Sequence, residues 1–258
     1  MIKLVVSDID GTLLLGEKRE LSTEIYDIIL ELKKRNLFFA AASGRQLENM
    51  KNLFAPIADD IFYIAENGAI CQWEGEPEVL SEFERELAMR ILCEVEKFPD
   101  CKVAVSTSGT QYIKSGDYAF YEYMTDFVKY RTTMIDSFEN IQDPIIKIAF
   151  YNEDAQDEHY EYFKTVFKNE IRVAKAGNGW VDFISLDSNK GTGLKFLLEK
   201  LGIALDEVIC FGDQQNDIEM LELAGTSYAM AHASRDVQKH AKYITESVEK
   251  TLKELLKM

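Results

Sequence analysis

The chain has 258 residues, of which 47% are hydrophobic, and its formal net charge is −16. This length suffices for a core domain with one sizeable insertion, and no apolar run approaches the roughly 20 residues that a membrane helix needs. The acidic balance excludes nucleic acid and anionic membrane surfaces as partners, because both need a basic footprint, and an anionic small substrate would need a metal or local cations.

The N-terminal sequence and the spacing of the cysteines indicate the cellular compartment of the protein. The chain begins Met-Ile-Lys-Leu-Val-Val-Ser-Asp and turns acidic after a short apolar run. It lacks the apolar segment and the small-residue cleavage site of a signal peptide. The four cysteines lie far apart, with no C-x-x-C pair and no histidine cluster, so they indicate neither a zinc site nor a redox motif. We therefore expect a cytoplasmic protein with reduced, mostly buried thiols.

The first part of the chain alternates apolar runs with segments of helical periodicity. The β-branched run at residues 2–7 is typical of a strand that is buried on both faces. Four apolar residues at helical spacing then follow a Ser/Thr start signal and predict a helix over residues 22–35. The next predicted elements are strands over residues 37–42 and 61–64 and a helix over residues 46–54.

The same alternation resumes near the C-terminus. The predicted elements there are a helix over residues 193–201, a strand over 208–211 and a helix over 218–223. Strands and helices that alternate in this way predict an α/β fold with a doubly wound parallel sheet, and such sheets bind ligands at the carboxyl ends of their strands.

The middle section, residues 81–184, has a different pattern and predicts a separate α+β lobe. Its predicted elements are helices over residues 83–97 and 155–167 and strands over 102–106, 145–150 and 181–184. Pro77 and the polar residues 187–189 are the expected hinges. The predicted domains are therefore a core of residues 1–80 with 185–258, and an inserted domain of residues 81–184.

Two aspartates close the first predicted strand, in the motif Asp-Ile-Asp-Gly-Thr at residues 8–12. Asp8 and Asp10 are two residues apart, so both carboxylates project from one side of an extended chain, and Gly11 then permits a sharp change of direction. Two carboxylates at one strand end repel each other without a cation, and Mg²⁺ suits that position. An acidic chain also produces this pattern by chance, whereas an EF-hand is excluded because Gly11 comes too early.

A second acidic cluster, Gly-Asp-Gln-Gln-Asn-Asp at residues 212–217, lies between a predicted strand and a predicted helix. Asp213 and Asp217 are four residues apart, which places them on one side of a helix start or of the turn before it. Helix capping explains one of these residues. It does not explain three acidic or amide groups together at a sheet edge.

Two shorter motifs complete the set. Ser-Gly-Arg at residues 43–45 follows another predicted strand, where the free N–H groups of the next helix can hold an anion. A serine cap explains the same residues. Lys190 stands before Gly191 at the second hinge, and a lone lysine is usually a solvated surface residue.

In this order the four motifs resemble those of the haloacid dehalogenase-like (HAD) hydrolase superfamily. The chain is similar in particular to the Cof-type branch, whose large α/β cap lies between the second and third motifs. The resemblance covers nearly the whole chain and is strongest over residues 1–70 and 186–245. It implies a Rossmann-like core and a phosphatase that uses Mg²⁺ and an aspartyl-phosphate intermediate to hydrolyse a small phosphate monoester, such as a sugar phosphate.

The resemblance also implies roles for single residues. Asp8 would be the nucleophile and Asp10 the general acid and base, while Ser43 and Lys190 would bind the transferring phosphoryl group. The residues that would hold or support Mg²⁺ are Asp8, Asp10 through its backbone carbonyl, Asp213 and Asp217.

The remaining matches are assigned to substrate or phosphate binding. They are Thr12, Gly44, Arg45 and Asn216. Asn67, in Glu-Asn-Gly-Ala at residues 66–69, also lies in a stretch similar to the family pattern. One departure is His232, in Ala-Met-Ala-His-Ala at residues 229–233, where the family commonly has an Asn. We expect it to be a surface or loop histidine.

Other functions on related folds compete with a phosphatase. A P-type ATPase would have Lys-Thr-Gly-Thr after the nucleophile, and a dehalogenase would not be expected to keep a carboxylate two residues on. A phosphosugar mutase on the same fold shares the four motifs and stays open. A non-catalytic phosphometabolite-binding protein is less favoured. Such a protein would be expected to lose one of four charged residues, and all four are present: Asp8, Asp10, Lys190 and Asp213.

The sequence suggests one stretch for substrate selection, Lys-Ala-Gly-Asn-Gly-Trp-Val-Asp at residues 175–182. Its glycines permit a tight turn, and Asn178 and Trp180 could face a sugar or a ring. An ordinary hairpin with Trp180 in its core explains the stretch equally well. The expected partner is a small phosphorylated metabolite.

Overall fold

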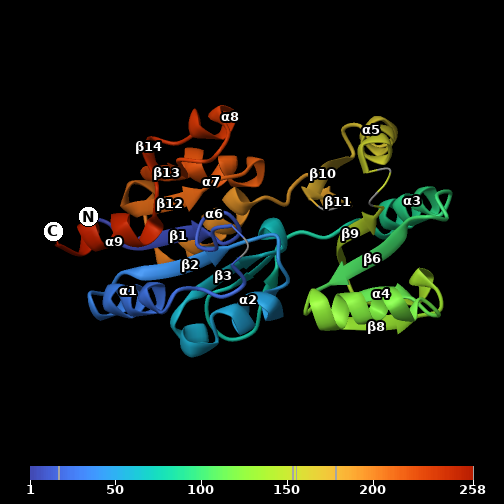
Figure 1. Cartoon of the computed structure of the whole chain (residues 1–258), viewed down its shortest axis with the longest axis horizontal. Coiled ribbons are helices and arrows are strands. Elements are labelled where there is room, and N and C mark those ends of the chain that lie inside the picture. The colour runs from blue at the N-terminus through green and yellow to red at the C-terminus, as the bar shows by residue number, and fades with distance from the viewer. Residues whose placement is uncertain (17, 153, 155, 178, 258) are drawn as a thin grey trace. The chain divides into compact units, whose positions relative to one another are not determined.

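A computed structural model describes residues 1–16, 18–152, 154, 156–177 and 179–257. The chain divides into two compact units (Figure 1). The first unit comprises Met1–Leu80 and Asn189–Met258, and the second comprises Ser81–Ser188. Among the described residues, no helix combines the length and the apolar character needed to cross a membrane.

The first unit is built on an eight-stranded sheet with the order β14-β13-β12-β1-β2-β3-β4-β5. Neighbouring strands are parallel from β14 to β3, and β4 and β5 extend the sheet in antiparallel fashion. The strands are β1 (Leu4–Asp8), β2 (Phe38–Ala42), β3 (Phe62–Ala65), β4 (Ile70–Gln72), β5 (Glu78–Val79), β12 (Val208–Gly212), β13 (Thr226–Met230) and β14 (Tyr243–Thr245). This confirms the predicted doubly wound α/β fold.

The strand order creates a switch point between β1 and β12. From β1 the chain proceeds to β2 and β3 on one side, and later to β12 and β13 on the other side. The carboxyl ends of β1 and β12 are therefore the place where a ligand site is expected in such a sheet.

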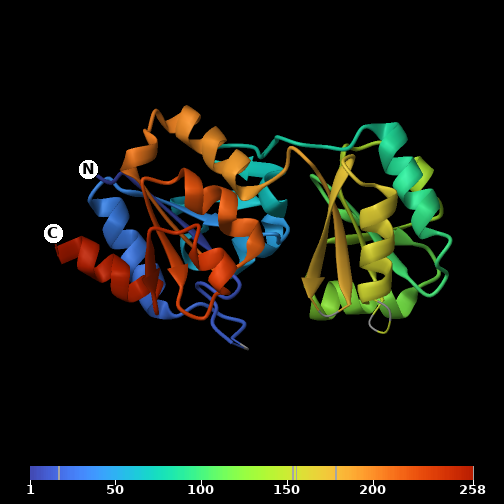
Figure 2. The same ribbon diagram turned by 90° about the horizontal axis from the view of Figure 1, so that it is seen from above.

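Helices cover both faces of this sheet, with α1 and α2 on one side and α6 and α7 on the other (Figure 1). The α-helices of the first unit are α1 (Thr23–Lys34), α2 (Leu47–Leu53), α6 (Lys190–Leu201), α7 (Ile218–Leu223), α8 (Arg235–Gln238) and α9 (Val248–Lys257). Short 3₁₀ turns are η1 (Ala55–Asp60), η2 (Glu66–Gly68), η5 (Leu205–Glu207) and η6 (Gln215–Asp217). Figure 2 shows α9 beside α1, and Lys253 of α9 forms an ion pair with Glu24 of α1.

Apolar burial holds these layers together. Leu194 and Leu197 of α6 and Leu221 of α7 pack against Leu4 and Val6 of β1 in one cluster. Burying such a side chain stabilises the fold by about 1.5–3 kcal/mol. The sheet thereby gains a rigid edge on which polar side chains can be held.

The second unit contains a six-stranded sheet with the order β10-β11-β9-β6-β7-β8. All its neighbours are antiparallel except β7 and β8. The strands are β6 (Lys102–Thr107), β7 (Gln111–Lys114), β8 (Thr132–Ile135), β9 (Ile145–Tyr151), β10 (Ile171–Gly177) and β11 (Trp180–Ser185). The helices are α3 (Arg85–Val95), α4 (Tyr118–Glu122), the π-helix η3 (Tyr123–Phe127), the 3₁₀ turn η4 (Phe138–Asn140) and α5 (Gln156–Val166).

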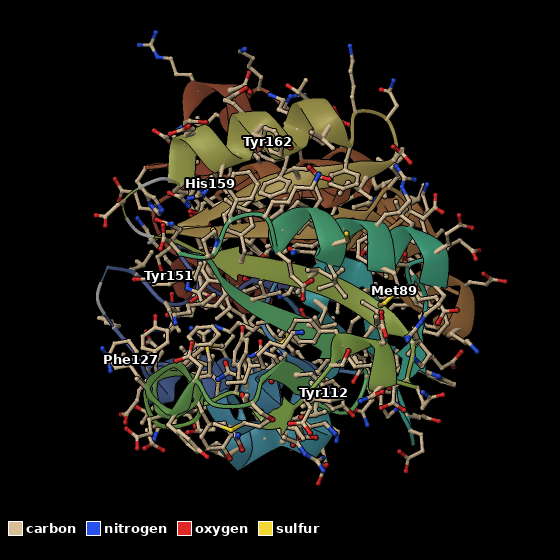
Figure 3. The ribbon with its side chains drawn as sticks, turned by 90° about the vertical axis from the view of Figure 1, so that its right-hand side faces the viewer. Met89, Tyr112, Phe127, Tyr151, His159 and Tyr162 are labelled. Atoms are coloured by element: carbon tan, nitrogen blue, oxygen red, sulfur yellow. The ribbon has the colours of Figure 1, made fainter. Side chains whose placement is uncertain are left out.

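The two faces of this second sheet are covered differently. Ile91 of α3 and Phe163 of α5 pack with Phe150 and Phe183 on one face. Figure 3 shows α5, with Tyr162 labelled, and η3, with Phe127 labelled, on opposite sides of the strands. On the other face, Phe120 of α4 and Met124 of η3 cover Ala104 and Ile113. Because side chains alternate along a strand, Trp180 of β11 lies on the face opposite to Phe183.

The end of the second unit differs slightly from the predicted domain boundary. β11 pairs as far as Ser185 with Ile171 of β10, so the second unit continues beyond residue 184. Pro77 precedes β5, which pairs with β4 in the first unit's sheet. All four cysteines are free, and Cys93 is the exposed one.

Candidate active site

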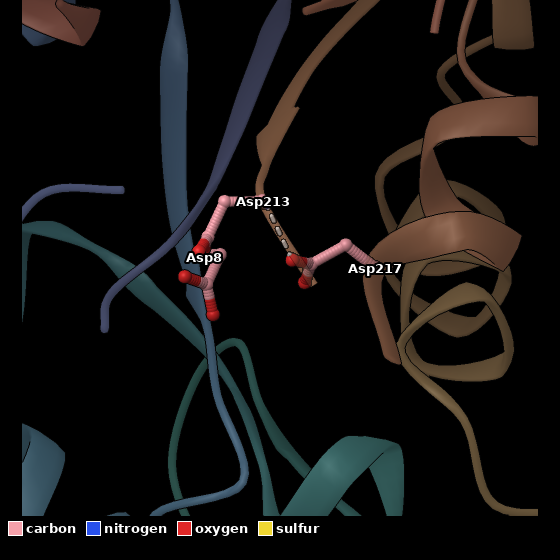
Figure 4. A group of neighbouring side chains, drawn as sticks. All are labelled: Asp8, Asp213 and Asp217. Carbon is pink, nitrogen blue, oxygen red and sulfur yellow. Dashed lines mark hydrogen bonds between the residues drawn. The ribbon is translucent and has the colours of Figure 1, made fainter. Parts of the chain in front are cut away.

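Three buried aspartates meet at the switch point of the first unit. Asp8 is the last residue of β1, Asp213 follows β12, and Asp217 closes the turn that leads into α7. One carboxylate oxygen from each lies within 4.8 Å of the others, and Figure 4 shows the three side chains pointing toward one another. No more than 5% of any of the three residues is exposed.

Lys190 neutralises part of this charge. It is the first residue of α6, is fully buried, and donates hydrogen bonds from Nζ to Asp8 Oδ1 and to Asp217 Oδ1, both at 2.5 Å. The structure therefore contradicts the view of Lys190 as a solvated surface residue. Asp8 Oδ2 has no hydrogen-bond partner within the described part of the chain.

The pKa values at this cluster follow from burial and charge. Burial raises the pKa of the Asp8 carboxyl well above its usual value. The attraction of Lys190 lowers this pKa, whereas the repulsion from Asp217 and Asp213 raises it further. Burial alone would lower the pKa of Lys190, but Asp217 and Asp8 raise it above its ordinary value. A further positive charge beside Asp8 would favour its ionised form.

Asp217 holds the turn that carries Asp213. Its Oδ2 accepts hydrogen bonds from the backbone N–H groups of Asp213 and Gln214, at 2.8 and 2.9 Å. Figure 4 marks the first of these bonds. With Oδ1 accepting from Lys190, Asp217 connects this turn to the start of α6.

Asp213 lies against the loop that follows β1. Thr12 Oγ1 donates to Asp213 Oδ1 at 3.0 Å, and Gln214 Nε2 donates to Oδ2 at 3.0 Å. Gly11 has φ +92°, and a Cβ there would lie 2.3 Å from Asp213 Oδ2. Only glycine fits at this approach, which explains the residue after Asp10.

Asp10 lies at the exposed side of the site and is held by Arg45. The guanidinium donates from Nε to Asp10 Oδ2 at 2.8 Å and from Nη2 to Oδ1 at 2.5 Å, while Nη1 donates to Asn49 Oδ1. This bidentate geometry fixes the carboxylate plane. The second motif thus contacts the first motif directly.

Ser43, Gly44 and Asn216 gather around Asn67. Ser43 is buried after β2, and its backbone carbonyl accepts from Asn67 N–H at 3.0 Å. Asn216 Nδ2 donates to Asn67 Oδ1 at 2.9 Å. The structure therefore brings the polar residues of all four motifs to one edge of the sheet.

His232 lies in the loop after β13 and is half-exposed, as expected for a loop histidine. Its Nε2 is 3.5 Å from Asp213 Oδ2.

The donor set fits a divalent cation. Three carboxylates converge, one buried oxygen of Asp8 has no partner among the described residues, and burial disfavours the Asp8 charge. Hard oxygen ligands of this kind are the ones that Mg²⁺ prefers.

The stretch expected to select substrates lies in the second unit. Asn178 falls outside the described residues. The ring of Trp180 stacks on Phe120 with centroids 5.9 Å apart and lies 5.3 Å from Tyr151. Beside these rings a crevice of about 240 Å³ is lined by Phe120, Tyr123, Tyr151, Ala119, Lys102 and Asp117.

Two features of the site in the first unit were not predicted from the sequence: the Arg45–Asp10 ion pair and the backbone conformation around Asn67. The Arg45–Asp10 pair joins residues far apart in sequence, and no local pattern indicates it. The backbone around Asn67 has positive φ at Glu66, Asn67 and Gly68. The Asn-Gly pair was the available signal, because both residues tolerate such angles.

Comparison with known proteins identifies the family to which this chain is similar. A family model described as haloacid dehalogenase-like hydrolase matches residues 5–251. The 5-amino-6-(5-phospho-D-ribitylamino)uracil phosphatase YbjI of Escherichia coli is 30% identical over 94% of this chain and 90% of its own. The HMP-PP phosphatase of Citrobacter koseri is 26% identical over 90% of this chain and 85% of its own.

A solved structure is also similar to this chain over nearly its whole length. A crystal structure of a protein from Eubacterium rectale is 27% identical and superposes with a TM-score of 0.88. It covers 98% of this chain and 99% of its own.

Proposed function

This chain belongs to the haloacid dehalogenase-like hydrolases and is a phosphatase of that superfamily, and we propose that it hydrolyses a small phosphate monoester with Mg²⁺ through an aspartyl-phosphate on Asp8. The observation that most supports this proposal is the hydrogen bonding of the Asp8 carboxylate. Lys190 fixes one of its oxygens at 2.5 Å, and its other oxygen is buried without a partner among the described residues. Such a fixed carboxylate is suited to attack an electrophile.

The proposed reaction has two steps. A carboxylate oxygen of Asp8 attacks phosphorus, the bond from phosphorus to the leaving oxygen breaks, and Asp10 gives that oxygen a proton. Water then attacks the phosphorus of the acyl phosphate, Asp10 takes up the proton, and the bond to Asp8 breaks. Ser43, Lys190 and Asn216 would hold the phosphoryl oxygens during both steps.

The metal would lie beside Asp8. Asp8, the Asp10 carbonyl and Asp213 would hold Mg²⁺, and Asp217 would support them through the turn and Lys190. When bound, Mg²⁺ supplies positive charge that offsets the phosphate and the carboxylates. Thr12 would act by orienting Asp213, to which it donates a hydrogen bond.

Removal of the metal is expected to remove the activity. Phosphate release from an aryl phosphate should fall to background with chelator and return with excess Mg²⁺, because the aspartates and phosphate would otherwise repel one another. Ca²⁺ should inhibit, since its higher and looser coordination changes the ligand geometry. Melting temperature should also rise with Mg²⁺. Full activity in chelator would refute the metal assignment.

The leaving group would be selected by the second unit, which we propose acts as a cap. The YbjI substrate named above carries a uracil ring on a phosphorylated chain. The aromatic rings beside Trp180 offer flat surfaces that suit a ring or a sugar face. A panel of sugar phosphates, nucleotides and ring-bearing phosphates, assayed by phosphate release, would identify the class.

Trp180→Ala tests this role of the second unit. We expect kcat/KM for the best substrate of the panel to fall far more than for acetyl phosphate, because a small substrate makes few contacts with a cap. Tyr162→Ala is the matched control, since Tyr162 is an aromatic residue of α5 that contacts Phe98 and Phe163 on the other face. Equal losses on both substrates, or a Tyr162→Ala profile that matches Trp180→Ala, would count against a specificity role.

A further inference from the structure

The loop after β3 has an unusual backbone. Glu66, Asn67 and Gly68 have φ values of +49°, +55° and +93°, so three successive residues lie in the left-handed region. Residues other than glycine rarely adopt it, and such strain persists where surrounding contacts fix it. We call residues 66–68 the 66–68 loop.

The 66–68 loop binds the backbone of the second motif. The N–H of Glu66 donates to the carbonyl of Arg45, and the N–H of Asn67 donates to the carbonyl of Ser43, both at 3.0 Å. The left-handed residues Glu66 and Asn67 thus both donate their backbone N–H groups to residues 43–45.

The side chain of Asn67 contacts one further segment and also lies against the second motif. Its Oδ1 accepts from Asn216 Nδ2 at 2.9 Å, and Asn216 belongs to the turn after β12. Its amide also lies against Gly44, where a Cβ would be 3.1 Å from Asn67 Nδ2. Asn67 is itself buried, with 7% of its surface exposed.

Gly68 lies against the start of α6. A Cβ at Gly68 would be 2.0 Å from the carbonyl oxygen of Asn189 and 3.3 Å from the backbone nitrogen of Lys190. One three-residue loop therefore contacts the segments that carry Ser43, Asn216 and Lys190.

We propose that Asn67 is a positioning residue, whose amide orients Asn216 toward the phosphoryl group while the 66–68 loop sets the spacing of Ser43 and Lys190. This inference rests on the proposed function, because those three residues are the proposed phosphate ligands. It adds a residue that contacts no reacting atom and acts through its neighbours.

Asn67→Gly is the test variant, because glycine keeps the left-handed backbone and removes the amide. Without its acceptor, Asn216 would lose one neutral hydrogen bond, so we expect inorganic phosphate to bind roughly 2- to 10-fold more weakly in Mg²⁺. KM should rise accordingly. Asn36→Gly is the matched control, since Asn36 also has positive φ (+60°) but is exposed at the end of α1.

A double-mutant cycle separates positioning from general destabilisation. If Asn67 acts through Asn216, then Asn67→Gly should weaken phosphate binding little further in an Asn216→Ala background. Effects that simply multiply would overturn the inference, as would an Asn67→Gly protein with wild-type phosphate affinity and KM.

Gly68→Ala provides a second measurement, and decides the matter if Asn67→Gly does not fold. The added methyl group must displace either the start of α6 or the 66–68 loop, so the spacing changes and kcat should fall at least 10-fold. Gly75→Ala is its control, because Gly75 has φ +65° and a Cβ at that position would have no described atom within 4 Å. If both alanine variants keep wild-type kcat, the loop does not set the spacing.

Phosphate release and phosphate binding together distinguish a failure of the proposed function from a failure of the inference on Asn67 alone. A wild-type chain that neither releases nor binds phosphate overturns the proposed function and this inference with it. A wild-type chain that does both, with an Asn67→Gly protein that matches it, overturns the inference alone.

Discussion

Asp8→Asn is expected to abolish phosphate release, with a loss of roughly 10⁴- to 10⁶-fold in kcat. The amide has nearly the same size as the carboxylate but is a poor nucleophile, so the proposed covalent step has no starting group. The measurement is steady-state phosphate release with the best substrate at saturating Mg²⁺.

The fold should survive this substitution. Burial and two neighbouring aspartates disfavour the Asp8 charge, so a neutral side chain relieves repulsion, while Lys190 keeps its bond to Asp217. We therefore expect the melting temperature without metal to stay the same or rise. A wild-type rate in Asp8→Asn would refute the covalent mechanism.

Asp10→Asn is expected to lower turnover by about 10²- to 10⁴-fold, through loss of proton transfer. The two half-reactions should respond differently. An aryl phosphate has a good leaving group that needs little protonation, so Asp8 can still be phosphorylated, whereas water still needs a base in the second step. We expect a burst of about one phenol per enzyme followed by slow turnover, measured by rapid mixing.

Asp27→Asn is the control for this variant, because it removes one carboxylate from an exposed position on α1 and should leave turnover unchanged. An Asp10→Asn protein without a burst, and with the same loss on alkyl and aryl phosphates, would assign Asp10 a role other than proton transfer. Arg45 orients Asp10 in the structure, so Arg45→Met should show a weaker form of the same pattern.

The core of the fold was predictable because its signals are local. The buried strands β1 and β2 are continuous apolar runs, and Ser22 accepts a hydrogen bond from Ile25 N–H as the N-cap of α1. The sequence places the start of α6 too late, at residue 193. Gly191 and Gly193 have low helix propensity, but the Asn189 side chain caps the helix by accepting from Thr192 N–H.

The shorter strands could not be found in this way. β4, β5 and β14 have three residues or fewer, and their strand character comes from pairing with a neighbour. In the second unit, β8 and β10 are edge strands of the sheet. Both strands contain polar and partly exposed residues, so no continuous apolar run marks them.

The candidate site shows the same division. The spacings within residues 8–12 and 212–217 predicted carboxylates at the ends of two strands. Asp8, Asp213 and Asp217 do converge there, whereas Asp10 lies at the exposed side against Arg45. The sequence did not indicate that Lys190 would be fully buried between two of them, because burial depends on how α6 packs. The contacts of Asn67 likewise depend on three segments that only the folded chain brings together.

The most direct test of the central claim is to trap the covalent intermediate on Asp8. The chain would be mixed with substrate and Mg²⁺, quenched during turnover, treated with borohydride and digested for mass spectrometry. Borohydride reduces an acyl phosphate to an alcohol, so the account predicts homoserine at position 8, formed only when substrate is present. Unmodified Asp8 throughout turnover, or reduction at another carboxylate, would contradict it.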